Sequence, residues 1–262
     1  MRLYPGTTVD SEFQLLRTGG YTGSLNDMQY AFLGDEGLTG GLPDRMAKFS
    51  GGTPGGGIAL VGSSQGGFGA GGGSMTLPGG MLEDDLVVVA ISAKSAIDAS
   101  LITTAGYTSR YDKVGSDPGA ILSYKFMGAV PDTTVSIGAA GNTKGAVVQV
   151  FRGVDTNTPF DFATVEAPGT SGSPDSPVAT TVTANALFLS IGFLNRDNVT
   201  SVTAPTGYTD LVFQNDPNAA NFSSTVMLSS KTIVSAGSED PDAYVTNGND
   251  FWVSLSEALR PA

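Results

Sequence analysis

The chain has 262 residues, a mass of 26.7 kDa and a net charge of −12, with 36 glycines and no cysteine or histidine. The absence of cysteine and histidine excludes disulfides, Cys–His zinc sites, haem–histidine ligation, Ser–His–Asp triads and Cys–His dyads built from this chain alone. The acidic charge argues against nucleic acid and anionic membrane surfaces as partners.

The start of the chain carries no recognisable targeting signal. Met1–Gly6 lacks the apolar core of a signal peptide. No apolar run reaches the roughly 18 residues that a membrane-spanning helix needs. We therefore expect a protein that is made in a cytoplasm and does not insert into a membrane.

Residues 1–50 contain a repeat with an offset of 17 residues. Thr22–Asp27, followed by Phe32, returns as Thr39–Asp44, followed by Phe49. Each copy predicts a turn that starts a short helix, because Asp at the first turn can accept from free N–H groups at the positive helix end. A third helix is expected at Ser11–Arg17.

Helices this short cannot hold a core alone, so we expect residues 1–50 to form an anchoring module that folds against a partner surface. Its candidate anchoring residues are Leu25, Asp27, Met28, Phe32, Leu42, Asp44, Met46 and Phe49.

Residues 51–80 hold 14 glycines in 30 positions. Ile58–Val61 and Met75–Leu77 are strand-like inserts between these glycines. We expect a connector with one or two strands joined by glycine-rich turns, and a flexible hinge is the alternative.

Residues 81–262 form a series of apolar runs separated by turn signals, with no amphipathic stretch of helix length. The predicted strands are 86–91, 121–126, 134–137, 146–151, 187–191, 224–234 and 251–255. This pattern predicts a mainly β fold, with an antiparallel β-sandwich or jelly-roll-like body.

The strand series runs twice. Corresponding segments are Leu86–Val88 and Leu187–Leu189, Gly106–Thr108 and Gly207–Thr209, Ser123–Lys125 and Ser229–Lys231, and Val147–Phe151 and Phe251–Leu255. About 75 residues per half are few for an independent sandwich. We therefore expect one sandwich made of two related halves, and two small tandem sandwiches are the alternative.

The acidic residues form no recognisable catalytic motif. The glutamates, expected in solvated loops and at strand edges, are Glu12, Glu36, Glu83, Glu166, Glu239 and Glu257. A glycosidase would need two carboxylates about 5–9.5 Å apart, which a sandwich could provide. We predict no enzymatic activity and no cofactor.

Calcium is the ion that the oxygen-rich loops would suit best. These loops are Asn215–Asn218, Glu239–Asp242 and Asn249–Asp250. Asx-rich turns are also common without any metal, so calcium binding stays open.

Three aromatic residues are candidate glycan contacts, because aromatic faces stack on sugars: Tyr107, Tyr208 and Trp252. A tyrosine at a sandwich turn is more often a packed corner residue. In the segment Phe151–Asp155, we expect Arg152 to pair with a nearby acid and Gly153 to open a turn.

Two parts of the chain resemble virion proteins of tailed bacteriophages. Thr22–Leu33, echoed at 39–49, is similar to a short helical repeat of such proteins. The segments that resemble β-sandwich domains of phage tail and appendage proteins are Leu86–Ile91, Gly106–Thr108 and Val147–Asp155. Those sandwiches often have Trp after the glycine, where this chain has Tyr.

The resemblance implies a structural virion protein, either a tail fibre or a spike-type appendage subunit that anchors through residues 1–50. A capsid decoration protein is one alternative, and a carbohydrate-binding module or glycan-active enzyme is another. The implied partners are other virion proteins and a host-surface glycan. The few charges leave apolar surface for a neighbour, so we expect a homo-oligomer, a trimer first, with close contact at residues 51–80.

Overall fold

The computed structural model describes residues 57–94, 97–113, 118–196, 199–215 and 224–262. The chain divides into two compact units, Met1–Thr53 and Pro54–Ala262. The predicted helical module of residues 1–50 and its anchoring residues lie outside the described residues. Within them, the helical structure is a single 3-10 turn, Ala99–Leu101, and no helix is long enough to cross a bilayer.

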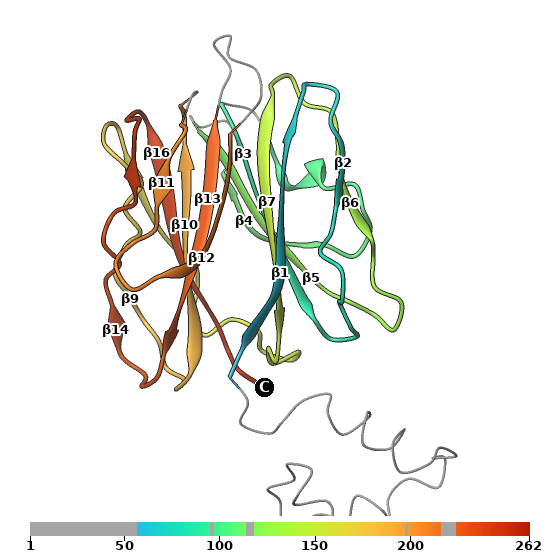
Figure 1. The fold of residues 1–262 in the computed structure, drawn as a ribbon, viewed down its shortest axis with the longest axis vertical. Coiled ribbons are helices and arrows are strands. Elements are labelled where there is room, and N and C mark those ends of the chain that lie inside the picture. Colours follow the sequence, from blue (N-terminus) through green and yellow to red (C-terminus); the bar gives the residue numbers. More distant parts are fainter. Residues whose placement is uncertain (1–56, 95–96, 114–117, 197–198, 216–223) are drawn as a thin grey trace, which may run out of the picture. The chain divides into compact units, whose positions relative to one another are not determined.

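Two five-stranded antiparallel sheets form the body of the second unit (Figure 1). Sheet 1 has the order β1 (Ala59–Phe68), β7 (Lys144–Arg152), β3 (Leu86–Ala93), β5 (Gly119–Phe126) and β4 (Thr108–Lys113). Sheet 2 has the order β12 (Thr209–Asn215), β13 (Thr225–Ile233), β10 (Ala186–Leu194), β16 (Trp252–Leu259) and β8 (Val165–Gly169). The prediction of a mainly β, antiparallel sandwich is confirmed.

Short strand pairs accompany the two large sheets. They are β2 (Gly73–Thr76) with β6 (Thr134–Ile137), β9 (Ala179–Thr180) with β14 (Ser238–Glu239), and β11 (Val202–Thr203) with β15 (Val245–Thr246). Both strands expected in the glycine-rich connector are present, as β1 and β2.

Each large sheet is built by one half of the unit, in the same strand order. Strands β1, β7, β3, β5 and β4 of sheet 1 correspond to β8, β16, β10, β13 and β12 of sheet 2. The register agrees residue by residue: Leu86 pairs with Phe126 in β5, and its counterpart Leu187 pairs with Thr232 in β13. The two related halves expected from the sequence are therefore the two sheets of one sandwich.

One predicted correspondence is wrong. The sequence comparison set Phe151 against Leu255, whereas Phe151 pairs with Leu86 and its counterpart Leu259 pairs with Leu187. The two strands alternate with period 2, so a shift by an even number of residues keeps every side chain on its expected face. Hydrophobic pattern alone could not detect that error.

The sandwich core lies between the two sheets. Leu86, Val88 and Ala90 of β3 face it, together with Leu189 and Ile191 of β10. The intervening residues of β3 face a second cluster on the outer side of sheet 1, which β2 and β6 cover. Because both faces are covered, all eight residues of β3 are buried, and the strand reads as a continuous apolar run.

The middle of the outer face of sheet 2 is polar and lies between two apolar clusters, whereas the outer face of sheet 1 is apolar. Ser190, Ser254 and Ser256 are fully buried on it. The hydroxyl of Ser176 lies 2.8 Å from that of Ser190 and 2.7 Å from that of Ser254. The Tyr244 hydroxyl lies 2.9 Å from that of Ser229. Hydrogen bonds between side chains thus replace apolar packing in the middle of this layer.

Candidate functional site

A buried ion pair joins the two sheets. Arg110 of β4 donates to Glu257 of β16, with N–O distances of 3.0 Å from Nε and 2.9 Å from Nη2. Glu257 is 0% exposed and also accepts from the Thr164 hydroxyl. Burial raises the pKa of Glu257, and the bonds from Arg110 and Thr164 offset part of that effect.

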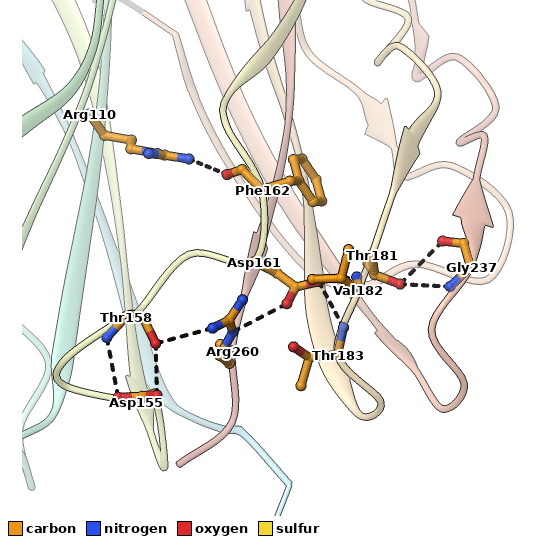
Figure 2. A network of polar contacts seen from close by, with 10 residues as sticks. All are labelled: Arg110, Asp155, Thr158, Asp161, Phe162, Thr181, Val182, Thr183, Gly237 and Arg260. Atoms are coloured by element: carbon orange, nitrogen blue, oxygen red, sulfur yellow. Dashed lines mark hydrogen bonds and ion pairs between the residues drawn. The ribbon is translucent and has the colours of Figure 1, made fainter.

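The cation of this pair, the Arg110 guanidinium, makes further contacts of its own. The Arg110 guanidinium also donates to the Phe162 carbonyl (Figure 2), and its carbon lies 4.1 Å from the centre of the Phe160 ring. Glu257 was expected in a solvated position, and that expectation is wrong. Val253, Leu255 and Leu259 of the same strand face the core, so period 2 places Glu257 there as well.

A second polar network surrounds Asp161 (Figure 2). Its carboxylate accepts from the backbone N–H of Val182 at 2.6 Å, from that of Thr183 at 3.2 Å, and from Arg260 Nε at 3.3 Å. Arg260 also donates to the Thr158 hydroxyl. Burial alone would raise the pKa of Asp161, but these hydrogen bonds together hold it below its ordinary value.

Arg152 occupies the position in sheet 1 that Arg260 occupies in sheet 2. It donates to Asp85 at 2.8 and 2.7 Å, and Gly153 follows with a φ of 84°. The expectation that Arg152 pairs with a nearby acid at a turn is confirmed. Both arginines lie at the C-terminal end of a core strand and bind a buried aspartate.

A tyrosine–lysine–acid cluster occurs once in each half. Lys125 lies 5.7 Å from the ring centre of Tyr107 and 2.6 Å from Asp132. The second copy comprises Tyr208, Lys231 and Glu239, with distances of 5.6 Å and 2.7 Å. Burial is the main cause that raises the pKa of both tyrosines, so both phenols stay neutral.

The glycine before each tyrosine has a left-handed backbone, with φ of 88° at Gly106 and 80° at Gly207. A Cβ at Gly106 would lie 3.1 Å from the Lys125 side chain. Both the turn and the close lysine therefore favour glycine here. This is the physical basis of the Gly-Tyr-Thr segment that the two halves share.

The candidate glycan residues do not lie together. Tyr107, Tyr208 and Trp252 pack against three different hydrophobic clusters. Trp252 donates its indole N–H to the Ser171 carbonyl at 2.9 Å and lies so close to Gly169 that a Cβ there would be 2.1 Å from the ring. No shared stacking platform is formed by these residues, and their role in glycan contact stays a prediction.

The oxygen-rich loops are placed only in part by the structure. Glu239 is bound to Lys231, while burial and the charges of Asp240 and Asp242 raise the pKa of Asp175. Among the described residues, no group of three acidic side chains could hold a metal ion. Calcium binding stays a prediction.

Comparison with known proteins assigns no family to the chain. No protein-family model matches it, and searches of curated proteins and of solved structures gave no match. A functional proposal therefore depends on the residues and geometry of this chain.

Proposed function

We propose that the chain is a structural subunit of a bacteriophage virion, of the tail fibre or spike type. Residues 1–50 attach it to the particle, and the sandwich of residues 57–262 projects. The likeness of residues 22–33 and of the sandwich segments to phage virion proteins supports this proposal.

The observation that carries the proposal is the use of buried charge in the described residues. Asp85, Asp161 and Glu257 are each at most 5% exposed and each is paired with an arginine. A carboxylate whose oxygens are filled by intramolecular donors is poorly placed to exchange protons with a substrate. Such pairs hold neighbouring segments of the sandwich together, which suits a structural subunit.

Particle incorporation of the full chain tests the proposal. Phage particles are purified, and the protein is detected by mass spectrometry and localised by antibody labelling in electron micrographs. We expect it on the tail in stoichiometric amount. Label on the capsid would support the decoration protein instead, and absence from particles would reject a virion role.

Two variants test attachment through residues 1–50. Phe32→Asp with Phe49→Asp should abolish incorporation, whereas Val130→Asp, at a side chain 88% exposed on the sandwich, should leave incorporation unchanged. Urea unfolding should show the sandwich equally stable in both. Normal incorporation of the double variant would contradict anchoring by this repeat.

A further inference from the structure

The two large sheets end in four edge strands, and three of these are protected against pairing with another chain. Edge strands present free N–H and C=O groups, which proteins commonly guard with charges, proline, bulges or short length. Strand β4 carries Arg110, Asp112 and Lys113. Strand β8 has five residues, including Pro168. Strand β12 is regular only after a bulge beside Asp210.

Strand β1 has none of the charged or proline guards. It is ten residues long, and in the described part of the chain it pairs with β7 alone (Figure 1). A bulge lies near its start, after which Gly62–Phe68 continues in regular register. Ser63, Gln65 and Gly67 are exposed. Its counterpart β8 is half as long, so the two halves differ at this edge.

Charge favours a second copy of the same chain as the partner of this edge. With a net charge of −12, two copies repel over most of their surfaces. No charged residue occurs between Lys48 and Glu83, so the repulsion between like chains is smallest at β1. Gly66 and Gly67 also allow close approach of a second backbone.

A groove beside β1 would receive side chains from such a partner. It lies between β1 and β2 and is lined by Gly66, Phe68, Met75 and Thr76, among others. The lining carries no charge, so an uncharged strand can approach it without burying an unpaired ion.

We propose that β1 pairs antiparallel with β1 of a second copy about a two-fold axis, joining both copies of sheet 1 into one continuous sheet. Such an isologous contact uses the same surface on both partners and closes at two copies. It therefore gives a dimer rather than the trimer expected from composition, and it does not depend on the virion assignment.

Charge substitutions on β1 of the full chain test this contact by light scattering. The wild type should show twice the mass of 26.7 kDa. Ser63→Lys with Gln65→Lys should give a single-copy mass, because like charges then face each other across the axis. Lysine makes the chain less acidic overall, so general repulsion cannot explain that loss. Ser63→Glu with Gln65→Glu should also be monomeric.

Mixing the two variants is the decisive measurement. Lysine on one copy then faces glutamate on the other, so an equimolar mixture should recover the dimer. The matched control, Ser109→Lys with Thr232→Lys, adds the same charge at exposed positions of β4 and β13 and should leave the dimer intact. Circular dichroism checks that every variant is folded.

Three outcomes would overturn the proposal. A monomeric wild type would mean that another segment, or none, occupies the edge. A trimeric wild type would require a different contact. Failure of the folded lysine and glutamate variants to form a dimer when mixed would show that β1 does not face β1.

Discussion

The two large sheets have the same strand order but differ in the middle of their outer faces, which is apolar in sheet 1 and polar in sheet 2. Equivalent residues, sheet 1 first, are Val89 and Ser190, Ala146 and Ser254, and Val148 and Ser256. In sheet 1 this layer packs against β2 and β6. In sheet 2 the hydroxyls of Ser190 and Ser254 bond to that of Ser176, and the Ser256 hydroxyl donates to the Pro177 carbonyl. Strand order and inner core can thus be kept while the covering layer changes, provided that buried hydroxyls find partners.

The two halves also differ at the ion pair between Arg110 and Glu257. Breaking this pair should have the largest effect on stability. The counterparts of Arg110 and Glu257 are Leu211, which packs against a cluster on the outer face of sheet 2, and Gln149, which donates to the Asp210 carbonyl. Arg110→Leu should lower the free energy of unfolding by about 3–5 kcal/mol, because it leaves Glu257 buried without its cation. Urea unfolding measures this loss.

Replacing both residues of the ion pair by their counterparts should restore most of the lost stability. Adding Glu257→Gln to Arg110→Leu removes the buried charge, so we expect the double variant to recover more than half of the loss. A double variant as unstable as Arg110→Leu alone would show that the counterparts cannot replace the ion pair.

Exchanging residues of the outer faces should have the next largest effect. Val89→Ser puts a hydroxyl into the apolar layer of sheet 1 and should cost about 2–4 kcal/mol, from lost packing and an unpaired polar group. Ser190→Val should cost about 1–3 kcal/mol, since Ser176 loses one partner and keeps Ser254. The comparison would be contradicted if neither exchange lowered the free energy of unfolding in urea.

The arginine–aspartate pairs allow a test by pH. The pKa of Asp161 is lowered in the folded state, so its contribution to stability is complete above its ordinary pKa of about 3.9 and is lost as pH falls through the lowered value. Asp161→Asn should cost about 1–3 kcal/mol at pH 7. The difference from wild type should shrink near pH 3, measured by urea unfolding.

The exposed Glu83→Gln serves as the control for that measurement. It should stay within about 0.5 kcal/mol of wild type at both pH values. A difference between Asp161→Asn and wild type that does not change with pH would contradict the role given to the ionised Asp161.

The tyrosine clusters should give the smallest effect. Tyr208 donates to Glu239 at 3.3 Å, whereas the buried Tyr107 hydroxyl has no partner among the described residues. Asp132 is one methylene shorter than Glu239, so Asp132→Glu should reach Tyr107 and raise stability by about 1 kcal/mol. Thermal unfolding should show that this gain disappears in a Tyr107→Phe background.

The sequence predicted the central strands and the edge strand β1, and it missed the other three edge strands. Strands β3, β5, β7, β10, β13 and β16 were expected because burial on both faces leaves long apolar runs. Strands β4, β8 and β12 were not expected, since edge positions admit Arg110, Pro168 and Asp210, which weaken a strand pattern. Strands β9 and β14 of the short pairs have two residues each. They are too short to show an alternation of apolar and polar residues in the sequence.

The polar networks were less predictable than the fold. The pairing of Arg152 with an acid followed from its place at a strand end. The position of Glu257 in the core could have been found from the period of its strand, but its partner could not. Arg110 lies 147 residues away in sequence, and only the packing of one sheet on the other brings the two side chains together.

The repeated strand order also bears on whether either half is a folding unit by itself. Each half contributes one five-stranded sheet, and the central core lies between the two sheets. A single half would expose its share of that core to water. Each half therefore supplies the apolar surface that the other must bury, and the two sheets together make one domain.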